Sequence, residues 1–374
     1  MNRLENSCLF PRGWRREVHN FAIARSSRVR GSPTQPSDHW FVAVLRQICA
    51  LKGMGLWSQS ALAHLTRLHG SGRERVEETM RRTAACLLIC GLATILAGNA
   101  LAQEIDWKKV DAALGRTGAA MPGGVQRYAL PRSDLNVAVD GVAIKPALAL
   151  GGWVAFEPAH GGAMVMGDVV LTETEIKPVM TKLLEGGLEI TALHNHLLRA
   201  NPATFYMHVG GHGDPVKMAE TIRAALALSK TPAESGQAAP AMALDLPTAQ
   251  LDEILGVKGR ATGGVYQFSV PRRDPITENG MNVPGAMGSA NAVNFQPTGQ
   301  GKAAITGDFV VTADEVNPLI RALRAGAIEV TAIHSHMLDE QPRLFFVHFW
   351  ANDDAVRLAR GIRAALDKTA IAKS

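Results

Sequence analysis

The sequence predicts an α+β fold made of two tandem homologous units that pack on each other as a pseudo-dimer. Residues 167–226 align with residues 307–366 at a constant offset of 140, and 25 of the 60 positions are identical. Self-similarity at a fixed period is typical of an internal duplication. Within each unit, short apolar or alternating runs predict strands, and a longer amphipathic run predicts a helix. We therefore expect each unit to be a mostly antiparallel sheet with two helices.

The first unit is expected to contain strands, a helix, two strands and a helix, in that order. Thr172 is a suitable N-cap for a helix over residues 172–185, Glu175 completes a capping box, and two glycines supply the stop. An amphipathic run over residues 214–228 predicts the closing helix. The expected strands cover residues 126–130, 152–156, 163–171, 189–196 and 204–209.

Residues 80–102 contain the three parts of a secretory signal peptide. A basic start at Met80 is followed by a mostly apolar run from Ala84 to Ala97 and by a small-x-small cleavage site that ends at Ala102. The alternative is a transmembrane anchor, but the run is shorter than the roughly 20 apolar residues that a spanning helix needs. We therefore expect cleavage near Ala102, a periplasmic or secreted protein, and no stable membrane span after cleavage.

A signal peptide belongs at an N-terminus, and this expectation sets the domain boundaries. Residues 1–79 are expected to be a spurious, disordered extension upstream of a true start at Met80. Repeat unit 1 is expected at residues 103–230 and repeat unit 2 at residues 247–374. The Ala/Pro/Ser-rich stretch between them, residues 231–246, is typical of a linker.

The charge and the cysteines of the expected mature chain exclude two classes of function. After Ala102 there remain 25 basic and 28 acidic residues, without a Lys/Arg stripe in either repeat, so no nucleic-acid partner is expected. All four cysteines precede residue 100, which excludes a disulfide framework in the mature chain. Any bound metal would therefore be held by nitrogen and oxygen ligands.

Histidines recur in the same pattern in both units. ALHNHLL at residues 192–198 returns as AIHSHML at residues 332–338, and another histidine follows the second of each pair after twelve residues. Side chains alternate along a strand, so His194 and His196 should share a face, and His208 joins them if the next strand returns as a hairpin neighbour. Three nitrogen ligands with an open position are typical of catalytic zinc. The expected metal ligands are His194, His196, His208, His334, His336 and His348.

Several alternatives accompany this metal hypothesis. A His-x-His pair can also pack on a half-buried strand without any metal. Against this, neighbouring positions diverged between the copies while all six histidines stayed: Asn195 became Ser335, Tyr206 became Phe346 and Gly210 became Trp350. Zinc is favoured over copper, iron and manganese by ligand type. His212 is a fourth candidate in the first unit only, since Asn352 replaces it in the second, and the first unit is expected to be the more active.

Two residues are candidates for catalytic roles. Asp168, like Asp308 in the second copy of the Gly-Asp pair, either orients a histidine or forms a turn. Arg132 either clamps a substrate carboxylate or is merely exposed and solvated. The alternation along the histidine strand places Glu189 and Glu329 on the opposite face. No Ser-His-Asp order, P-loop or dinucleotide fingerprint occurs in its required context.

The motifs GDVVLTETEIKPVM, EITALHNHLL and FYMHVGGHGD, with their second copies GDFVVTADEVNPLI, EVTAIHSHML and FFVHFWANDD, resemble those of the LppY/LpqO family of exported bacterial proteins of unknown function. The resemblance covers about residues 105–370. It implies an envelope or periplasmic location and the duplicated architecture, and it supplies no reaction. The chain departs from the family's lipoproteins because Ile89 precedes Cys90, where lipidation signals need a small residue.

The histidine spacing is also similar to the zinc site of acetolactate decarboxylases, although only the three histidines carry over. Three functions therefore stay open. The first is a periplasmic zinc-dependent lyase or hydrolase that acts on a small oxygen-rich substrate. The second is a non-catalytic metal-binding or metal-buffering protein. The third is an envelope interaction module with structural histidines.

Overall fold

The computed structural model describes residues 105–233 and 243–372. The expected extension at residues 1–79 and the expected signal peptide at residues 80–102 lie outside the described residues. So does most of the expected linker, at residues 234–242.

The first repeat is built on a six-stranded sheet in which every neighbouring pair is antiparallel. All five expected strands are present, but the histidine strand ends at His194, two residues before its expected end. In sheet order the strands are β1 (Ala119–Ala120), β2 (Gln126–Pro131), β5 (Gly151–Ala159), β6 (Gly162–Leu171), β8 (Phe205–Gly213) and β7 (Glu189–His194).

The second repeat has the same antiparallel sheet with the same connectivity, which confirms the expected α+β duplication. Its strands, from the histidine edge, are β15 (Glu329–His334), β17 (Phe345–Asp354), β14 (Lys302–Val311), β13 (Ala290–Gly299), β10 (Val265–Pro271) and β9 (Arg260–Thr262). Smaller ladders join β3 (Ala138–Val139) to β4 (Val142–Ala143), and β12 (Met281–Asn282) to β11 (Thr277–Glu278) and β16 (Glu340–Gln341).

The two helices expected in the first unit are α6 (Glu173–Glu185) and α7 (Pro215–Leu226). The capping box forms as expected, because Glu175 Oε2 accepts a hydrogen bond of 2.8 Å from the backbone N–H of Thr172. Asp214 caps α7 by accepting from Val216 N. The corresponding helices of the second repeat are α9 (Ala313–Ala325) and α10 (Ala355–Leu366).

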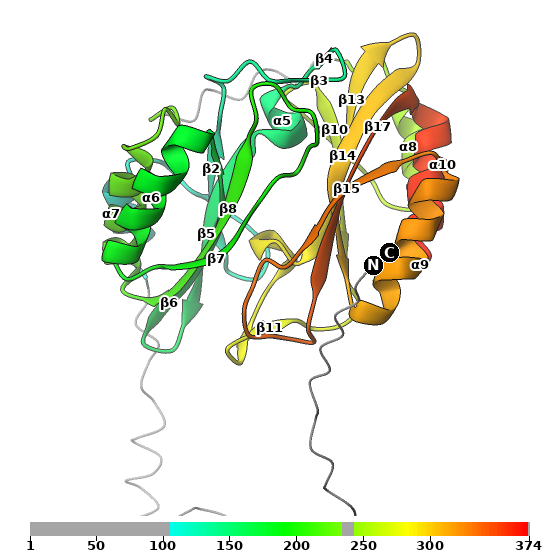
Figure 1. Cartoon of the computed structure of the whole chain (residues 1–374). Helices are drawn as coiled ribbons and strands as arrows, with labels where there is room; N and C mark the ends of the chain where they lie inside the picture. Colours follow the sequence, from blue (N-terminus) through cyan, green and yellow to red (C-terminus); the bar gives the residue numbers. More distant parts are fainter. Residues whose placement is uncertain (1–104, 234–242, 373–374) are drawn as a thin grey trace, which may run out of the picture. The chain divides into compact units, whose positions relative to one another are not determined.

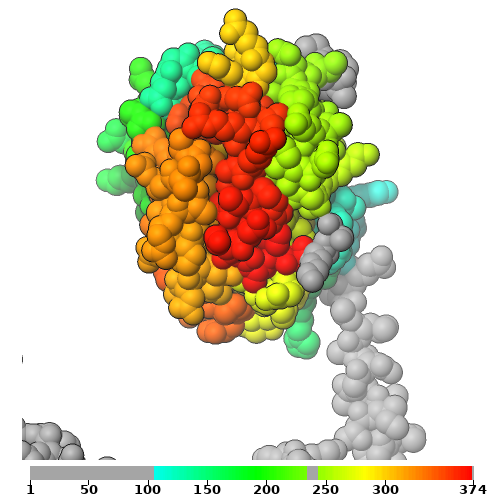
Figure 2. Space-filling model, turned by 90° about the vertical axis from the view of Figure 1, so that its right-hand side faces the viewer, coloured from blue at the N-terminus to red at the C-terminus, as the bar shows by residue number. Residues whose placement is uncertain are grey.

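Each repeat also begins with a helix that the pattern did not predict. These helices are α4 (Trp107–Leu114) and α8 (Thr248–Leu255), and each buries only two of its eight residues, which is too few to set a visible period. Within residues 105–233 and 243–372, the remaining helical segments are α5 (Pro146–Ala149) and the 3-10 turn η1 (Gly285–Met287). In Figure 2, α10 in red lies between α9 in orange and the yellow-green segment that includes α8.

The longer helices cover the outer face of each sheet, and the two inner faces pack together with α5 and η1 on that side (Figure 1). Along β6, Val165 and Val169 face the helices, whereas Met164 and Met166 point to the second repeat. The layers are therefore helix, sheet, sheet, helix. Two apolar clusters between the sheets contain side chains of both repeats, among them Met166 with Phe346 and Tyr206 with Trp350.

Polar contacts also join the repeats, which pack on each other as expected. Gln296 accepts from Lys145 N at 2.8 Å and donates to Ala143 O at 2.7 Å. Arg199 of the first repeat is bound by Asp140 of the same repeat and by Glu329 of the second, at 2.8 Å and 2.7 Å. Among the described residues, no helix has the length and apolar character required to cross a membrane.

Candidate metal centre

The inner face of each sheet carries a row of residues that leads to the histidines. Asp168 on β6 pairs directly with His208 on β8, which pairs with Ala192 on β7. Directly opposed residues of antiparallel strands share a face, so the side chains of Asp168 and His208 are neighbours. In the second repeat the same row contains Asp308 and His348.

The other two histidines of each repeat come from the end of the edge strand and the turn beyond it. His194 closes β7 opposite Tyr206, on the same face as His208. His196 follows in the turn, where its ring stacks on Tyr206 with 3.3 Å between ring centroids. His336 stacks in the same way on Phe346, at 3.4 Å. An aromatic ring thus supports His196 in the first repeat and His336 in the second. Tyr206 and its equivalent Phe346 both supply this ring.

The sequence predicts one site per unit, but the structure brings the two sets together. Across the junction of the repeats, the ring centroids of His194 and His334 are 3.5 Å apart. Those of His196 and His348, and of His208 and His336, are 3.8 Å apart. The Nε2 atoms of His194 and His348 are separated by 3.3 Å. We call this arrangement the six-histidine cluster: His194, His196, His208, His334, His336 and His348.

Two groups within the six-histidine cluster have the geometry of a metal site. In each group, one nitrogen from every member lies within 4.8 Å of the others. The first group, His194, His196 and His208, is the one that the sequence predicts for the first unit. The second group contains the three histidines of the second repeat and, in addition, His194. His194 therefore belongs to both groups, and the second group draws on both repeats.

Several nitrogens of the six-histidine cluster are buried without a hydrogen-bond partner. They are Nδ1 of His194 and Nε2 of His196, His208, His334 and His336. His348 donates from Nδ1 to Gly307 O at 2.8 Å, which leaves its Nε2 as the lone-pair nitrogen. A buried polar atom without a partner costs about 1–3 kcal/mol. A bound cation would give these nitrogens the partner that they lack.

The surroundings keep the imidazoles neutral. Burial, reinforced in each of them by neighbouring histidines, lowers the pKa of His194, His196, His208, His336 and His348 well below the usual value. Burial also lowers the pKa of His334, to about 4. A neutral imidazole keeps the lone pair that a metal ion needs. At neutral pH the cluster is therefore ready to bind a cation without first losing protons.

Two buried carboxyl groups flank the histidines. Asp168 lies 3.8 Å from His196 Nε2 and 3.9 Å from His208 Nε2. Asp308 lies 3.3 Å from His336 Nε2 and 3.8 Å from His348 Nδ1. Burial raises the pKa of Asp168 to about 7, against the opposing effect of Arg127. Each carboxyl group thus lies beside ring nitrogens of two histidines of its own repeat and can accept a proton there.

The Gly-Asp pair that precedes these contacts is not a turn. Both copies lie inside a strand, and glycine is required there by close packing. A Cβ on Gly307 would stand 1.9 Å from Ala292 O, and one on Gly167 would stand 2.7 Å from Val154 Cγ1. Of the two roles expected for Asp168, the turn is therefore wrong, and the contact with histidine is what the structure shows.

The chain matches the model of a family described as Domain of Unknown Function (DUF1259), over residues 108–228 and 249–368. The chain belongs to the DUF1259 family. It contains two tandem copies, and each DUF1259 copy contributes three histidines and one carboxyl group to the centre. No curated protein matches the chain.

Two solved structures share a weak likeness with this DUF1259 protein. One is a trimeric bacterial microcompartment shell protein, PduB, at 11% identity and a TM-score of 0.19; the match covers 68% of this chain and 90% of that chain. The other is EtuB from Clostridium kluyveri, at 8% identity and a TM-score of 0.16, with coverage of 67% and 88%.

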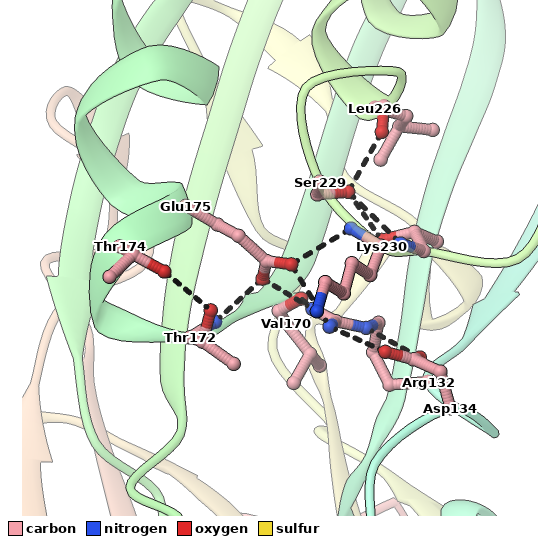
Figure 3. Close-up of polar contacts among 10 residues, drawn as sticks. Arg132, Asp134, Val170, Thr172, Thr174, Glu175, Leu226, Ser229 and Lys230 are labelled. Atoms are coloured by element: carbon pink, nitrogen blue, oxygen red, sulfur yellow. Dashed lines mark hydrogen bonds and ion pairs between the residues drawn. The ribbon is translucent and has the colours of Figure 1, made fainter.

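Arg132, a candidate for a substrate clamp, does not lie in the six-histidine cluster. The expectation that it is exposed is wrong, since its side chain is 0% exposed. Figure 3 shows its guanidinium between Asp134 and Glu175, to which it donates four hydrogen bonds of 2.8–3.2 Å, with a fifth to Val170 O. All its N–H groups are thus taken by the chain itself. Arg272 of the second DUF1259 copy also binds Asp274 and Glu315, but its Nε has no hydrogen-bond partner.

His212, the fourth candidate of the first unit, also lies apart. It is on β8, but it is exposed and belongs to neither group of candidate ligands. Two surface hollows, one lined by residues between Pro271 and Ser289 and one between α4 and α7, contain no residue of the six-histidine cluster.

Sequence reasoning missed two kinds of residue at the centre. Thr191 donates to His336 O, and Thr331 donates to His196 O, each across the junction of the DUF1259 copies at 2.6 Å. Their identity in EITALH and EVTAIH is a signal that was present in the sequence. Arg127 and Trp153 lie beside Asp168 on the inner face. The duplication does not single them out, because the equivalent residues of the second copy are different: Gln267 and Ala292.

Proposed function

We propose that this protein binds a divalent transition metal ion, with zinc as the first choice, in the six-histidine cluster between its two DUF1259 copies. The observation that supports it is the convergence of buried imidazole nitrogens that make no hydrogen bond. Structural histidines would be expected to satisfy their ring nitrogens within the fold. Nitrogen-only ligands suit zinc, copper, iron or nickel better than magnesium or calcium.

The two groups of candidate ligands make different predictions about stoichiometry. If each group holds an ion, the chain binds two equivalents, and His194 would bridge the two ions as an imidazolate after releasing its ring proton to solvent. If the groups act as one centre, the chain binds one. Zinc–nitrogen bonds of about 2.0–2.1 Å place two ligands of one ion at most about 4 Å apart. Nitrogens within 4.8 Å of one another need only small ring rotations to reach that geometry.

Metal analysis of the purified full-length protein tests this proposal. We expect one or two equivalents of bound metal in the wild type. His196→Ala and His336→Ala should each lower the metal content while the circular dichroism spectrum is retained. His212→Ala is the matched control, because His212 lies on the same strand as His208 but outside the cluster. Absence of metal from the wild type, or unchanged content in both cluster variants, would refute the proposal.

A metal-dependent lyase or hydrolase of a small oxygen-rich substrate is a second candidate. It is favoured by the first group, in which three histidines leave a coordination position open, with Asp168 beside two of them. When bound, zinc polarises a carbonyl oxygen or acidifies a water molecule. Asp168, which lies beside the Nε2 atoms of His196 and His208, would take up a proton next to the metal.

The enzyme candidate requires a coordination position of the metal that is open to a substrate. Metal buffering and a purely structural role do not require one. The protein is loaded with cobalt(II) and mixed with acetohydroxamate, a small bidentate oxygen ligand. A change in the cobalt absorption bands supports an open position. An unchanged spectrum at full cobalt occupancy supports a closed site, and with it the non-catalytic alternative.

We also propose that the protein is exported and belongs with the LppY/LpqO proteins. The support is the tripartite pattern of residues 80–102 and the repeated motifs. Cell fractionation with N-terminal sequencing is the test. A periplasmic or secreted form that begins at Gln103 supports export, and a cytosolic form that retains residues 80–102 contradicts it.

A further inference from the structure

Arg127 is a half-buried cation on the inner face of the first repeat. It lies on β2 opposite Ala155, whose side chain is buried between the two sheets. Its guanidinium carbon lies 4.0 Å from the centre of the Trp153 ring, and Nη1 donates to Ala286 O of the second repeat. Trp153 is directly opposite Asp168, which is directly opposite His208. Arg127 therefore stands beside the row that leads to the six-histidine cluster.

The charge of Arg127 has no close counter-ion in the structure. Among residues 105–233 and 243–372, no carboxylate oxygen lies within 4.0 Å of its guanidinium. Arg132 and Arg272, two buried arginines that directly follow the equivalent strands β2 and β10, each have two carboxylates within 3.0 Å. Burial lowers the pKa of Arg127 to about 10, and the more distant Asp168 opposes this shift only in part. Buried charges in proteins are as a rule paired, so an anion is the missing partner.

The second DUF1259 copy has no equivalent cation. Gln267 takes the place of Arg127, and its amide is engaged by Ala147 O at 2.8 Å. Ala292 takes the place of Trp153, as the pairing of Ala292 with Asp308 shows. The two sides of the six-histidine cluster thus differ in charge, although their histidines match.

We infer that Arg127 and the metal ion together bind a small oxyanion, a carboxylate or a phosphate, on the first-repeat side of the centre. This inference rests on the proposed metal site. Trp153 supports one face of the guanidinium, and Nη1 is taken by Ala286 O, so Nε and Nη2 are the N–H groups that remain for a planar anion. A bidentate contact from arginine fixes a carboxylate or phosphate in orientation, while a metal ion accepts a further oxygen of the same ligand. The substrate class of the centre is therefore a metal-chelating oxyanion.

Isothermal titration of the zinc-loaded full chain tests the inference. Oxalate and inorganic phosphate are the two probes, and the tighter of them identifies the anion class. Arg127→Gln gives the first repeat the residue of the second, and Arg260→Gln on β9, whose side chain is exposed, is the matched control. We expect Arg127→Gln to keep the zinc content of the wild type and to weaken anion binding at least tenfold. Arg260→Gln should bind as the wild type does.

The outcomes separate this inference from the metal proposal. A wild type that binds no zinc overturns the metal site and the oxyanion site that depends on it. A wild type that binds zinc but neither anion, or an Arg127→Gln protein with unchanged anion affinity, overturns the oxyanion site alone. Arg127→Lys keeps the charge and loses the planar fork, so we expect an intermediate affinity. If Arg127→Gln does not fold, unchanged affinity in Arg127→Lys overturns the inference.

Discussion

Three arginines, one on β2 and two directly after β2 and β10, show that the role of a residue is decided by its partners. Arg132 and Arg272 each bind two carboxylates, and each carboxylate set includes the capping glutamate of the following helix. Glu175 also accepts from Lys230 N, so one buried pair ties together β2, the start of α6 and the end of the repeat (Figure 3). Arg127, with no such partner, is the arginine available to a ligand.

Replacing Arg132 should therefore affect folding and leave metal binding intact. In Arg132→Met the buried Glu175 loses its cation, and removal of one member of a buried pair costs about 3–5 kcal/mol. Urea unfolding measures this loss, and metal analysis of the folded fraction should match the wild type. Arg273→Met is the control, since its side chain is 70% exposed, and a change within about 0.5 kcal/mol is expected. A stable Arg132→Met protein that has lost metal would contradict this reading.

The same pair predicts how stability depends on pH. Burial raises the pKa of Glu175, but hydrogen bonds from Arg132, Thr172 N and Lys230 N outweigh burial, and the net pKa is lowered. A lowered pKa in the folded state stabilises the protein above the ordinary glutamate value of about 4.3, and this contribution is lost as the pH falls through the folded value. The free energy of unfolding should therefore fall less steeply between about pH 5 and pH 3 in Glu175→Gln than in the wild type. Parallel curves would show that Glu175 does not contribute in this way.

At the residue scale, the sequence predicted the six histidines, because their residue type and spacing carry the chemistry. It did not predict the burial of Arg132, since Asp134 is local but Glu175 is 43 residues away. The sequence did not single out Arg127 either, for a different reason. It occurs in only one copy, so no repeat singles it out, and its importance depends on the absence of a nearby carboxylate.

At the scale of elements, a bulge in each histidine strand sets the geometry of the centre. The register of β7 with β8 shifts between Ile190 and Ala192, and that of β15 with β17 shifts between Val330 and Ala332. The residue skipped in each register is the threonine that binds the other repeat, Thr191 or Thr331. Bulges of this kind re-aim one side chain and bend the strand. Here each bulge directs its threonine to the turn of the opposite copy that carries His336 or His196.

Removing either threonine hydrogen bond should weaken metal binding without unfolding the protein. Thr191→Val and Thr331→Val each remove a hydrogen bond worth about 1 kcal/mol and free the turn at His336 or His196. Loss of such outer contacts lowers metal affinity by about 10–100-fold. Competition with a zinc chelator measures the affinity, and the serine variants should restore it. Equal loss in the serine and valine variants would show that the hydroxyl is not responsible.

The bulge also explains where the prediction of elements failed. Strict alternation over residues 189–196 places Glu189 and Glu329 opposite the histidines. The extra residue reverses this, because Glu189 pairs with Gly210 and Glu329 with Trp350, on the inner face. A one-residue shift exchanges the faces of a strand, and nothing in the local sequence marks it. The capping boxes, by contrast, are local and were predicted correctly.

At the scale of the whole molecule, each repeat depends on the other for burial. The inner faces are apolar on both sides of the centre, and the clusters between the sheets take residues from both copies. The duplication and the packing of the units could be predicted from the sequence. The joining of the two expected histidine sets into one six-histidine cluster could not, because it depends on how the sheets face each other.

A single repeat should therefore not behave as an independent monomer. Residues 103–230 expressed alone would expose Met166, Tyr206 and their apolar neighbours to water. Exposed apolar patches of this kind drive self-association. We expect size-exclusion chromatography with light scattering to show dimers or aggregates, with monomers restored by the second repeat. A monodisperse, folded monomer would contradict this expectation.

The fusion of the two DUF1259 copies permits something that a symmetric dimer cannot have. In a dimer of identical subunits, every substitution beside the axis occurs twice, so a cation added on one side is added on the other. In the fused chain, Arg127 and Trp153 stand on one side, and Gln267 and Ala292 on the other. A ligand bound as proposed would therefore have one orientation and not two equivalent ones. The two ends of a chelated molecule would then be chemically distinct, with one held by charge and the other free to react or to leave.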